Sequence, residues 1–248
     1  TGTALKQLEA ARKDDDVKGV LLELDTPGGA VTDADLVHRA VVKLQSKGKK
    51  VLVHMGDICA SGGYYVAAAA DEVWALPTTL TGSIGVIIRS LNVSRLMDKI
   101  GIDDESIASG ANKQILSMTR PVTPEQRALL QGIVDELYGR FVEVVAAGRE
   151  LPVETVRPLA DGRLFTARQA AEAKLIDAVG YRDEALDRLK ALAGEGPFTV
   201  VRYRSQPSLF DLFRPPGTAL DQLAESLLRE AGGPRALYMY AAAPAGDR

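Results

Sequence analysis

The alternation of strand-like and helix-like runs in the first third of the chain constrains its fold more than any other feature. Short apolar, β-branched runs have the composition of buried strands, and the runs between them carry apolar residues at helical spacing. The strand-like runs are residues 17–24, 50–55 and 72–76, and the helix-like runs are residues 4–12, 32–46 and 62–70. Repeated strand, helix and strand units favour right-handed crossovers. The sequence therefore predicts an α/β fold with a parallel sheet flanked by helices.

Helix-capping signals indicate the starts of several helices. Thr32 is the expected N-cap of the second helix. Thr123 precedes a proline and a glutamine at capping-box spacing, and a long amphipathic run follows it. Thr166 repeats the capping-box pattern before a shorter helix. Farther along the chain, residues 175–179 have the pattern of a strand and residues 219–230 that of a helix.

The chain is long enough to form a full core without disulfides or metals. It has 248 residues, and the periodic pattern breaks near Pro197. We therefore expect one core domain over residues 1–196, followed by a C-terminal extension and tail over residues 197–248.

Composition excludes several classes of function. The formal net charge of −3 provides no sustained positive field, so we expect no nucleic-acid partner. The single cysteine, Cys59, excludes an internal disulfide and a cysteine-based zinc cluster, and we expect neither a metal nor a cofactor. The sequence has no run of eighteen uncharged apolar residues, so we expect a soluble chain that follows a removed anchor or linker.

Two glycine-rich turns follow consecutive predicted strands, where ligands bind in open parallel sheets. They are Asp25-Thr26-Pro27-Gly28-Gly29 and Ala60-Ser61-Gly62-Gly63. Ser61 could attack a carbonyl carbon while the N–H of Gly62 and one from Gly28 or Gly29 hold the resulting oxyanion. The same residues also fit a plain N-cap whose glycines ease packing, and the residues alone leave both interpretations open.

A nucleophilic serine needs a base, and the candidates are few. His38 is predicted in a surface helix and His54 in a strand well before the turn, so we expect both to be structural. No histidine follows Ser61, which excludes a triad whose histidine comes after its serine. A lysine is the alternative, but free lysine titrates near ~10.4 and must be desolvated to act as a base. Lys113 differs from the other lysines because it lies between a run of small residues and an apolar pair.

Five blocks along almost the whole chain carry a family resemblance. They are DTPGGAV, ASGGYYVAAAAD, TLTGSIGVI, SGANK and DGRLFTARQAAEAKLID. With these blocks in this order, the chain resembles the bacterial signal peptide peptidase A (SppA) family, serine–lysine peptidases of the Clp/crotonase superfamily. The resemblance implies a superhelix of repeated β-β-α units, with parallel sheets flanked by helices, plus a C-terminal extension.

The resemblance also implies roles for individual residues. Ser61 would be the nucleophile, Lys113 the general base, and Ser83 the side chain that hydrogen-bonds this lysine. The oxyanion donors would be the backbone of Gly62 and of the DTPGG loop, with Gly29 preferred over Gly28.

Function and assembly follow from the same resemblance. A single set of blocks indicates the half-size form, which resembles a dome of eight subunits. In that assembly Lys113 would meet Ser61 of the next subunit. We expect a bacterial, membrane-associated and extracytoplasmic serine endopeptidase that degrades hydrophobic, unfolded peptides, such as remnant signal peptides.

Two segments are candidates for contact with the substrate groove. IGVII, after Ser83, is expected to form an apolar strand that is either a wall of this groove or plain core. The alanine-rich tail from about Pro234 resembles a substrate, and we expect it to bind in an active site and to be trimmed there. A frayed terminus is the alternative interpretation of the tail.

Rival functions stay open on the sequence. Crotonase-type enzymes of the same superfamily hold an acyl-CoA enolate and usually lack a nucleophilic serine. An inactive scaffold or membrane-protein partner would keep the fold without catalysis. The joint presence of Ser61, Ser83 and Lys113 argues against both. Cys59 lies on the strand side of the turn and is expected to be a packed thiol rather than the nucleophile.

Overall fold

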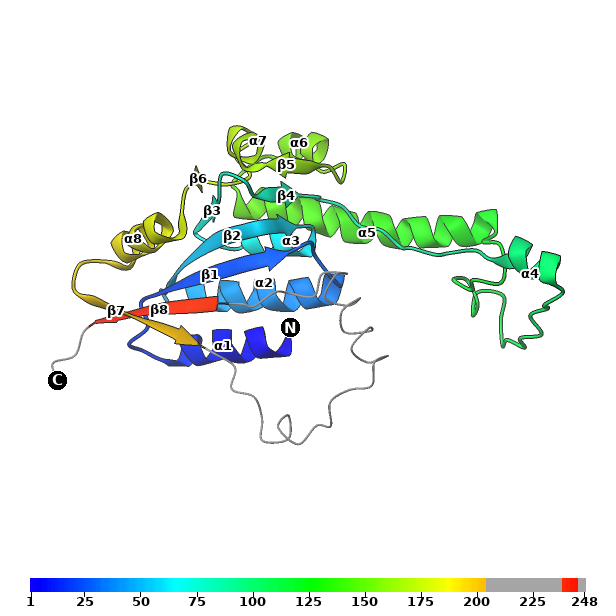
Figure 1. Cartoon of the computed structure of the whole chain (residues 1–248), viewed down its shortest axis with the longest axis horizontal. Coiled ribbons are helices and arrows are strands. Elements are labelled where there is room, and N and C mark those ends of the chain that lie inside the picture. Colours follow the sequence, from blue (N-terminus) through cyan, green and yellow to red (C-terminus); the bar gives the residue numbers. More distant parts are fainter. Residues whose placement is uncertain (204–237, 245–248) are drawn as a thin grey trace. The chain divides into compact units, whose positions relative to one another are not determined.

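The computed structural model describes residues 1–203 and 238–244 (Figure 1). The chain divides into two compact units. The first unit comprises residues 1–85 and 141–248, and the second comprises residues 86–140.

A mixed sheet is the centre of the first unit. Its strands are β1 (Gly19–Thr26), β2 (Lys50–Ala60), β3 (Glu72–Ala75), β4 (Leu80–Gly82), β5 (Leu164–Thr166), β6 (Ala178–Val179), β7 (Phe198–Tyr203) and β8 (Tyr238–Pro244). The pairs β1–β2, β2–β3, β2–β4 and β3–β6 are parallel, whereas β4–β5, β1–β8 and β7–β8 are antiparallel. The strand order is β5-β4-β2-β1-β8-β7, with β3 and β6 off this path.

Helices cover both faces of this sheet (Figure 1). Those of the first unit are α1 (Gly2–Lys13), α2 (Val31–Gln45), α3 (Gly62–Ala67), α6 (Val153–Val156), the 3₁₀ helix η1 (Arg157–Leu159), α7 (Ala167–Glu172) and α8 (Arg182–Ala193). On one face, Leu189 of α8 joins Leu21 of β1 and Leu52 of β2 in a fully buried cluster. Successive strand residues point to opposite faces, so the buried Leu22 faces the other helical layer. The predicted α/β fold with a largely parallel sheet between helices is confirmed, and the more specific superhelix stays a prediction.

The second unit contains α4 (Ser94–Ile100) and most of α5 (Pro124–Gly148), a helix that continues into the first unit. The predicted capping box at the start of α5 is present, since Thr123 N–H donates to Gln126 Oε1 at 3.1 Å and Gln126 N–H to Thr123 Oγ1 at 3.2 Å. Many large apolar side chains of this unit are exposed. They include Ile87, Leu91, Leu96, Ile100, Ile102 and Ile107.

Two local predictions are wrong. Thr32 is not the N-cap of α2, because the helix begins at Val31 and its cap is Ala30, without a side-chain capping bond. Residues 84–88, the IGVII segment, form no strand. The chain turns out of the sheet at Ser83, whose φ is 49°, and residues 84–88 pair with no strand among residues 1–203 and 238–244.

The C-terminal segment that can be described is part of the sheet. Residues 238–244 form β8, which lies between β1 and β7 of the same chain. Residues 219–230, predicted as a helix, lie outside the described residues. Binding of the tail in a neighbouring active site stays a prediction, as does the domain boundary at residue 196.

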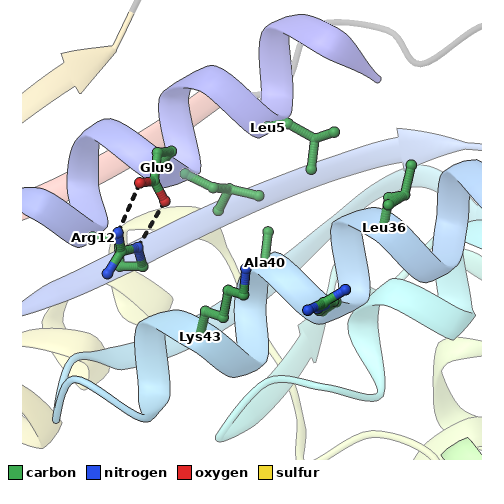
Figure 2. A pocket seen from close by; sticks show the side chains of 8 residues that line it. Leu5, Glu9, Arg12, Leu36, Ala40 and Lys43 are labelled. Atoms are coloured by element: carbon green, nitrogen blue, oxygen red, sulfur yellow. Dashed lines mark hydrogen bonds and ion pairs between the residues drawn. The ribbon is translucent and has the colours of Figure 1, made fainter.

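A groove of about 290 Å³ lies between α1 and α2 (Figure 2). Its apolar lining comes from Leu5, Leu8, Leu36 and Ala40, and its charged lining from Glu9, Arg12, Arg39 and Lys43. None of the candidate catalytic residues lines this groove, so it is not the candidate active site.

Candidate active site

Ser61 occupies a strained turn between β2 and α3. Its φ and ψ are 52° and −120°, a backbone conformation that costs a residue with a side chain about 1–3 kcal/mol. Ser61 N–H donates to Gly82 O of β4 at 2.8 Å, which fixes the turn. Ser61 is the N-cap residue of α3, but its side chain makes no capping bond. The strained backbone is therefore maintained at a serine whose hydroxyl makes no capping bond, and the choice between a catalytic and a structural Ser61 stays a prediction.

Ser83 lies beside Ser61 at the end of the adjacent strand. Ala60 of β2 pairs with Gly82 of β4, and each serine follows one member of that pair. Ser83 also has a positive φ, 49°, and its N–H donates to Arg163 O at 2.8 Å. Backbone strain at a non-glycine residue clusters at functional sites. The structure thus brings together the two serines singled out by the sequence, while their catalytic roles stay predictions.

The loop after β1 packs directly against the Ser61 turn. A Cβ added to Gly28, whose φ is 124°, would lie 2.8 Å from Ser61 Cβ. A Cβ added to Gly62 would lie 3.3 Å from Gly29 N. Thr26 Oγ1 orders this loop, because it accepts from Gly28 N–H at 3.2 Å and lies 3.1 Å from Gly28 O.

Two backbone N–H groups consequently lie next to each other beside the serine. They belong to Gly29 and Gly62, and neither donates a hydrogen bond within the part of the chain that the structure describes. Paired free N–H groups beside a nucleophile are what an oxyanion hole requires.

Lys113 lies in the second unit, in a turn next to the start of α5. Its N–H donates to Gly110 O at 3.1 Å, and Gln126 Nε2 of α5 donates to Ala111 O at 3.0 Å. The Lys113 side chain is exposed within its own chain. Because Lys113 and Ser61 belong to different units, a contact between them stays a prediction.

Asp104 organises the loop that precedes Lys113. Hydrogen bonds from the hydroxyls of Ser106 and Thr119, together with Ser106 N–H, lower the pKa of this carboxyl to about 2. Arg120 adds an ion pair at 3.4 Å. The loop is therefore shaped by polar contacts around one carboxylate.

The other candidate bases, His54 and His38, and the other candidate nucleophile, Cys59, are packed against neighbouring residues. His54 is buried, with Nε2 3.2 Å from Gly180 O. The ring of His38 packs edge-on against Tyr65, with ring centroids 5.3 Å apart. Cys59 is fully buried, and burial raises its pKa far above the ordinary value. The expectation of a packed thiol is confirmed.

The buried His54 makes stability depend on pH. Desolvation lowers its pKa below the ordinary 6.5, outweighing the opposing hydrogen bond to Gly180 O. As the pH falls through 6.5, His54 becomes protonated in the unfolded chain but stays neutral in the folded chain. The free energy of unfolding therefore decreases. We expect His54→Gln to show a smaller loss of thermal midpoint between about pH 7 and 5 than the wild type. Thermal melts with His38→Gln as control measure this, and an unchanged pH dependence would contradict it.

Three polar side chains next to Ser61 were not singled out from the sequence. Asp25, Thr79 and Thr81 each hydrogen-bond to the last part of β2. They lie inside the DTPGG and TLTGS blocks, so their place in these two blocks is the one signal that the sequence offers for them.

Neither a metal nor a membrane span is indicated by the described residues. No three His, Cys, Asp or Glu side chains among residues 1–203 and 238–244 are grouped to hold a metal ion. In the same residues, no helix has the length and apolar character to cross a bilayer.

Comparison with known proteins gives consistent matches. Residues 43–195, more than half of the chain, match peptidase family S49. A Synechocystis sp. protein named as a candidate protease is 41% identical over 202 residues, which cover 81% of this chain and 73% of the relative. An Enterococcus faecium protein named as a candidate signal peptide peptidase SppA is 38% identical over 83% of this chain and 60% of the relative.

A plant relative is named as a serine protease. The chloroplastic serine protease SPPA of Arabidopsis thaliana is 33% identical over 89% of this chain, but the match covers only 32% of the relative. The chain thus spans less than two thirds of the Enterococcus and Arabidopsis proteins.

Proposed function

The chain belongs to peptidase family S49 and is a serine peptidase by family, and from that premise we propose that it cleaves peptide bonds with Ser61 as its nucleophile. One observation carries the assignment to Ser61. Its strained turn lies directly against two N–H groups, of Gly29 and Gly62, that have no other acceptor in the described part of the chain.

The chemistry would run through an acyl-enzyme. Ser61 Oγ attacks the carbonyl carbon of the peptide bond, and Gly29 and Gly62 donate to the oxyanion. The serine proton passes to Lys113 Nζ and then to the leaving amine. A water molecule, activated by the same lysine, releases the acyl group from Ser61. Ser83, beside Ser61, hydrogen-bonds Lys113 and orients it.

The exposure of Lys113 supports a site shared between subunits. A lysine is a general base only when neutral, and burial favours the neutral form. Lys113 is exposed among the residues that the structure describes, and we propose that a second subunit buries it. The exposed apolar side chains of the second unit provide a surface for such contacts. We therefore propose a homo-octamer of half-size subunits in which Ser61 and Lys113 come from neighbours, built on a Clp/crotonase-like superhelix.

The proposed substrates are hydrophobic, unfolded peptides, including remnant signal peptides at the outer side of a bacterial membrane. The name of the Enterococcus relative, a signal peptide peptidase, supports this class. Peptides of this kind bind as an added strand, through main-chain hydrogen bonds. The chain's own tail is a further proposed ligand of a neighbouring active site.

Turnover of an apolar fluorogenic peptide tests this function. We expect the purified chain to cleave the peptide, and a fluorophosphonate probe to add its mass to Ser61 alone. Ser61→Ala should lose both, whereas Ser46→Ala, at an exposed serine after α2, should keep both. Turnover that persists in Ser61→Ala would contradict the assignment. A wild type that cleaves no peptide but binds coenzyme A would favour the crotonase-type function. A wild type that neither reacts with the probe nor binds coenzyme A would favour a scaffold.

A further inference from the structure

Strand β2 contains a bulge shortly before Ser61. Residues of β1 and β2 pair regularly up to Leu24 and Met55, and pairing resumes at Thr26 and Cys59. Over this interval β1 advances by two residues and β2 by four, so β2 holds two additional residues. A bulge bends its strand and redirects the residues after it.

The bulge decides which part of the glycine-rich loop faces Ser61. Before the bulge each β2 residue is numbered 31 above its partner in β1, and after it 33 above. The second register places Ser61 level with Gly28, whereas the first would place it level with Ala30. The short separation of Gly28 and Ser61 agrees with the second register. The bulge thus aligns the serine with the loop that carries the Gly29 N–H.

Asp25 holds the bulge from the β1 side. Its Oδ1 accepts the N–H of Ile58 at 3.2 Å, where regular pairing with β1 is interrupted. Gly56 leaves room for this carboxylate, because a Cβ there would lie 3.0 Å from Asp25 Cβ. One carboxylate therefore replaces the missing ladder contact opposite the bulge.

Two threonines hold the bulge from the β4 side. Thr79 Oγ1 donates to Gly56 O at 2.6 Å, and Thr81 Oγ1 donates to Cys59 O at 2.6 Å. Both threonines are fully buried. A carbonyl that loses its donor inside a folded protein is left unpaired, which costs free energy. A valine would fill the same space but could not satisfy these carbonyls.

Resting on the proposed role of Ser61, we infer that Asp25 and Thr79 are positioning residues of the active site. They hold the β2 bulge and thereby keep Ser61 level with Gly28 and Gly29. Neither residue has to touch the substrate. Their loss shifts the nucleophile relative to the oxyanion donors, so the chemical step is impaired more than substrate binding.

Kinetics of matched variants test this inference. We expect Thr79→Val and Asp25→Ala to lower kcat about tenfold or more, with KM changed by less than about threefold. Thr79→Ser should recover most of kcat because it returns the hydroxyl. Asp57→Ala is the control, since Asp57 lies exposed in the same bulge, and it should behave as the wild type.

Amide hydrogen exchange gives a readout that needs no activity. Peptides covering residues 55–62 should exchange faster in Thr79→Val and Asp25→Ala, but not in Asp57→Ala. Unchanged exchange together with unchanged kcat would overturn the inference, as would a kcat in Thr79→Ser as low as in Thr79→Val. An inactive wild type, or an active Ser61→Ala, would instead refute the proposed function, and the exchange rates would still show whether these side chains hold the bulge.

Discussion

Mixing Ser61→Ala protein with Lys113→Ala protein should restore activity that neither variant has alone. Each substitution removes one member of the proposed dyad, and we expect each to lower kcat by about 10⁴-fold or more. If the dyad joins two subunits, an active site needs an intact serine on one subunit and an intact lysine on its neighbour. Random assembly of an equal mixture meets both conditions in about a quarter of the sites. The expected result is therefore about a quarter of wild-type turnover.

Subunit exchange has to be shown independently for this result to be interpretable. Energy transfer between two labelled preparations would report exchange, and light scattering would show that both variants keep the wild-type assembly size. Background activity in a mixture that does exchange would place Ser61 and Lys113 in one chain. A double variant carrying both substitutions, mixed with wild type, is the control for simple dilution.

Local patterns predicted the central strands of the sheet and the turn that carries Ser61. Strong apolar runs separated by glycine-rich turns are typical of βαβ units, and β1, β2 and β3 appear close to the expected residues. Weaker signals failed where tertiary contacts decide the outcome. Thr32 has the side chain of a cap, but α2 starts one residue earlier. The short β4 and β5 pair with each other without a recognisable pattern of their own.

The site itself was only partly predictable. Ser61 and the glycines beside it have a local signature, because turns need glycine and a nucleophile needs N–H groups. Lys113 was selected mainly by family resemblance, and its side chain is exposed among the described residues. Asp25 and Thr79 act across strands, and such contacts depend on register, which a single strand's sequence does not specify.

Gly28→Ala should impair catalysis strongly, because Gly28 packs directly against Ser61. The new Cβ would lie 2.8 Å from Ser61 Cβ, a separation that real Cβ atoms essentially never show. It would also lie 3.1 Å from Gly62 N, which is tighter than most real Cβ contacts. The serine or the loop must therefore move, and displacements of about 1 Å can cost about a hundredfold in rate. We expect kcat to fall by about that factor, with a smaller change in KM.

Gly48→Ala separates the effect of the contact from the effect of backbone strain. Both glycines have positive φ, 124° at Gly28 and 75° at Gly48, so alanine is strained at either position. A Cβ on Gly48 meets no atom within 4 Å. Both variants should therefore lose thermal stability, while only Gly28→Ala should lose turnover and fluorophosphonate labelling of Ser61. Equal losses of turnover in the two variants would mean that strain alone explains the effect, and that close packing of the loop against Ser61 has no catalytic role.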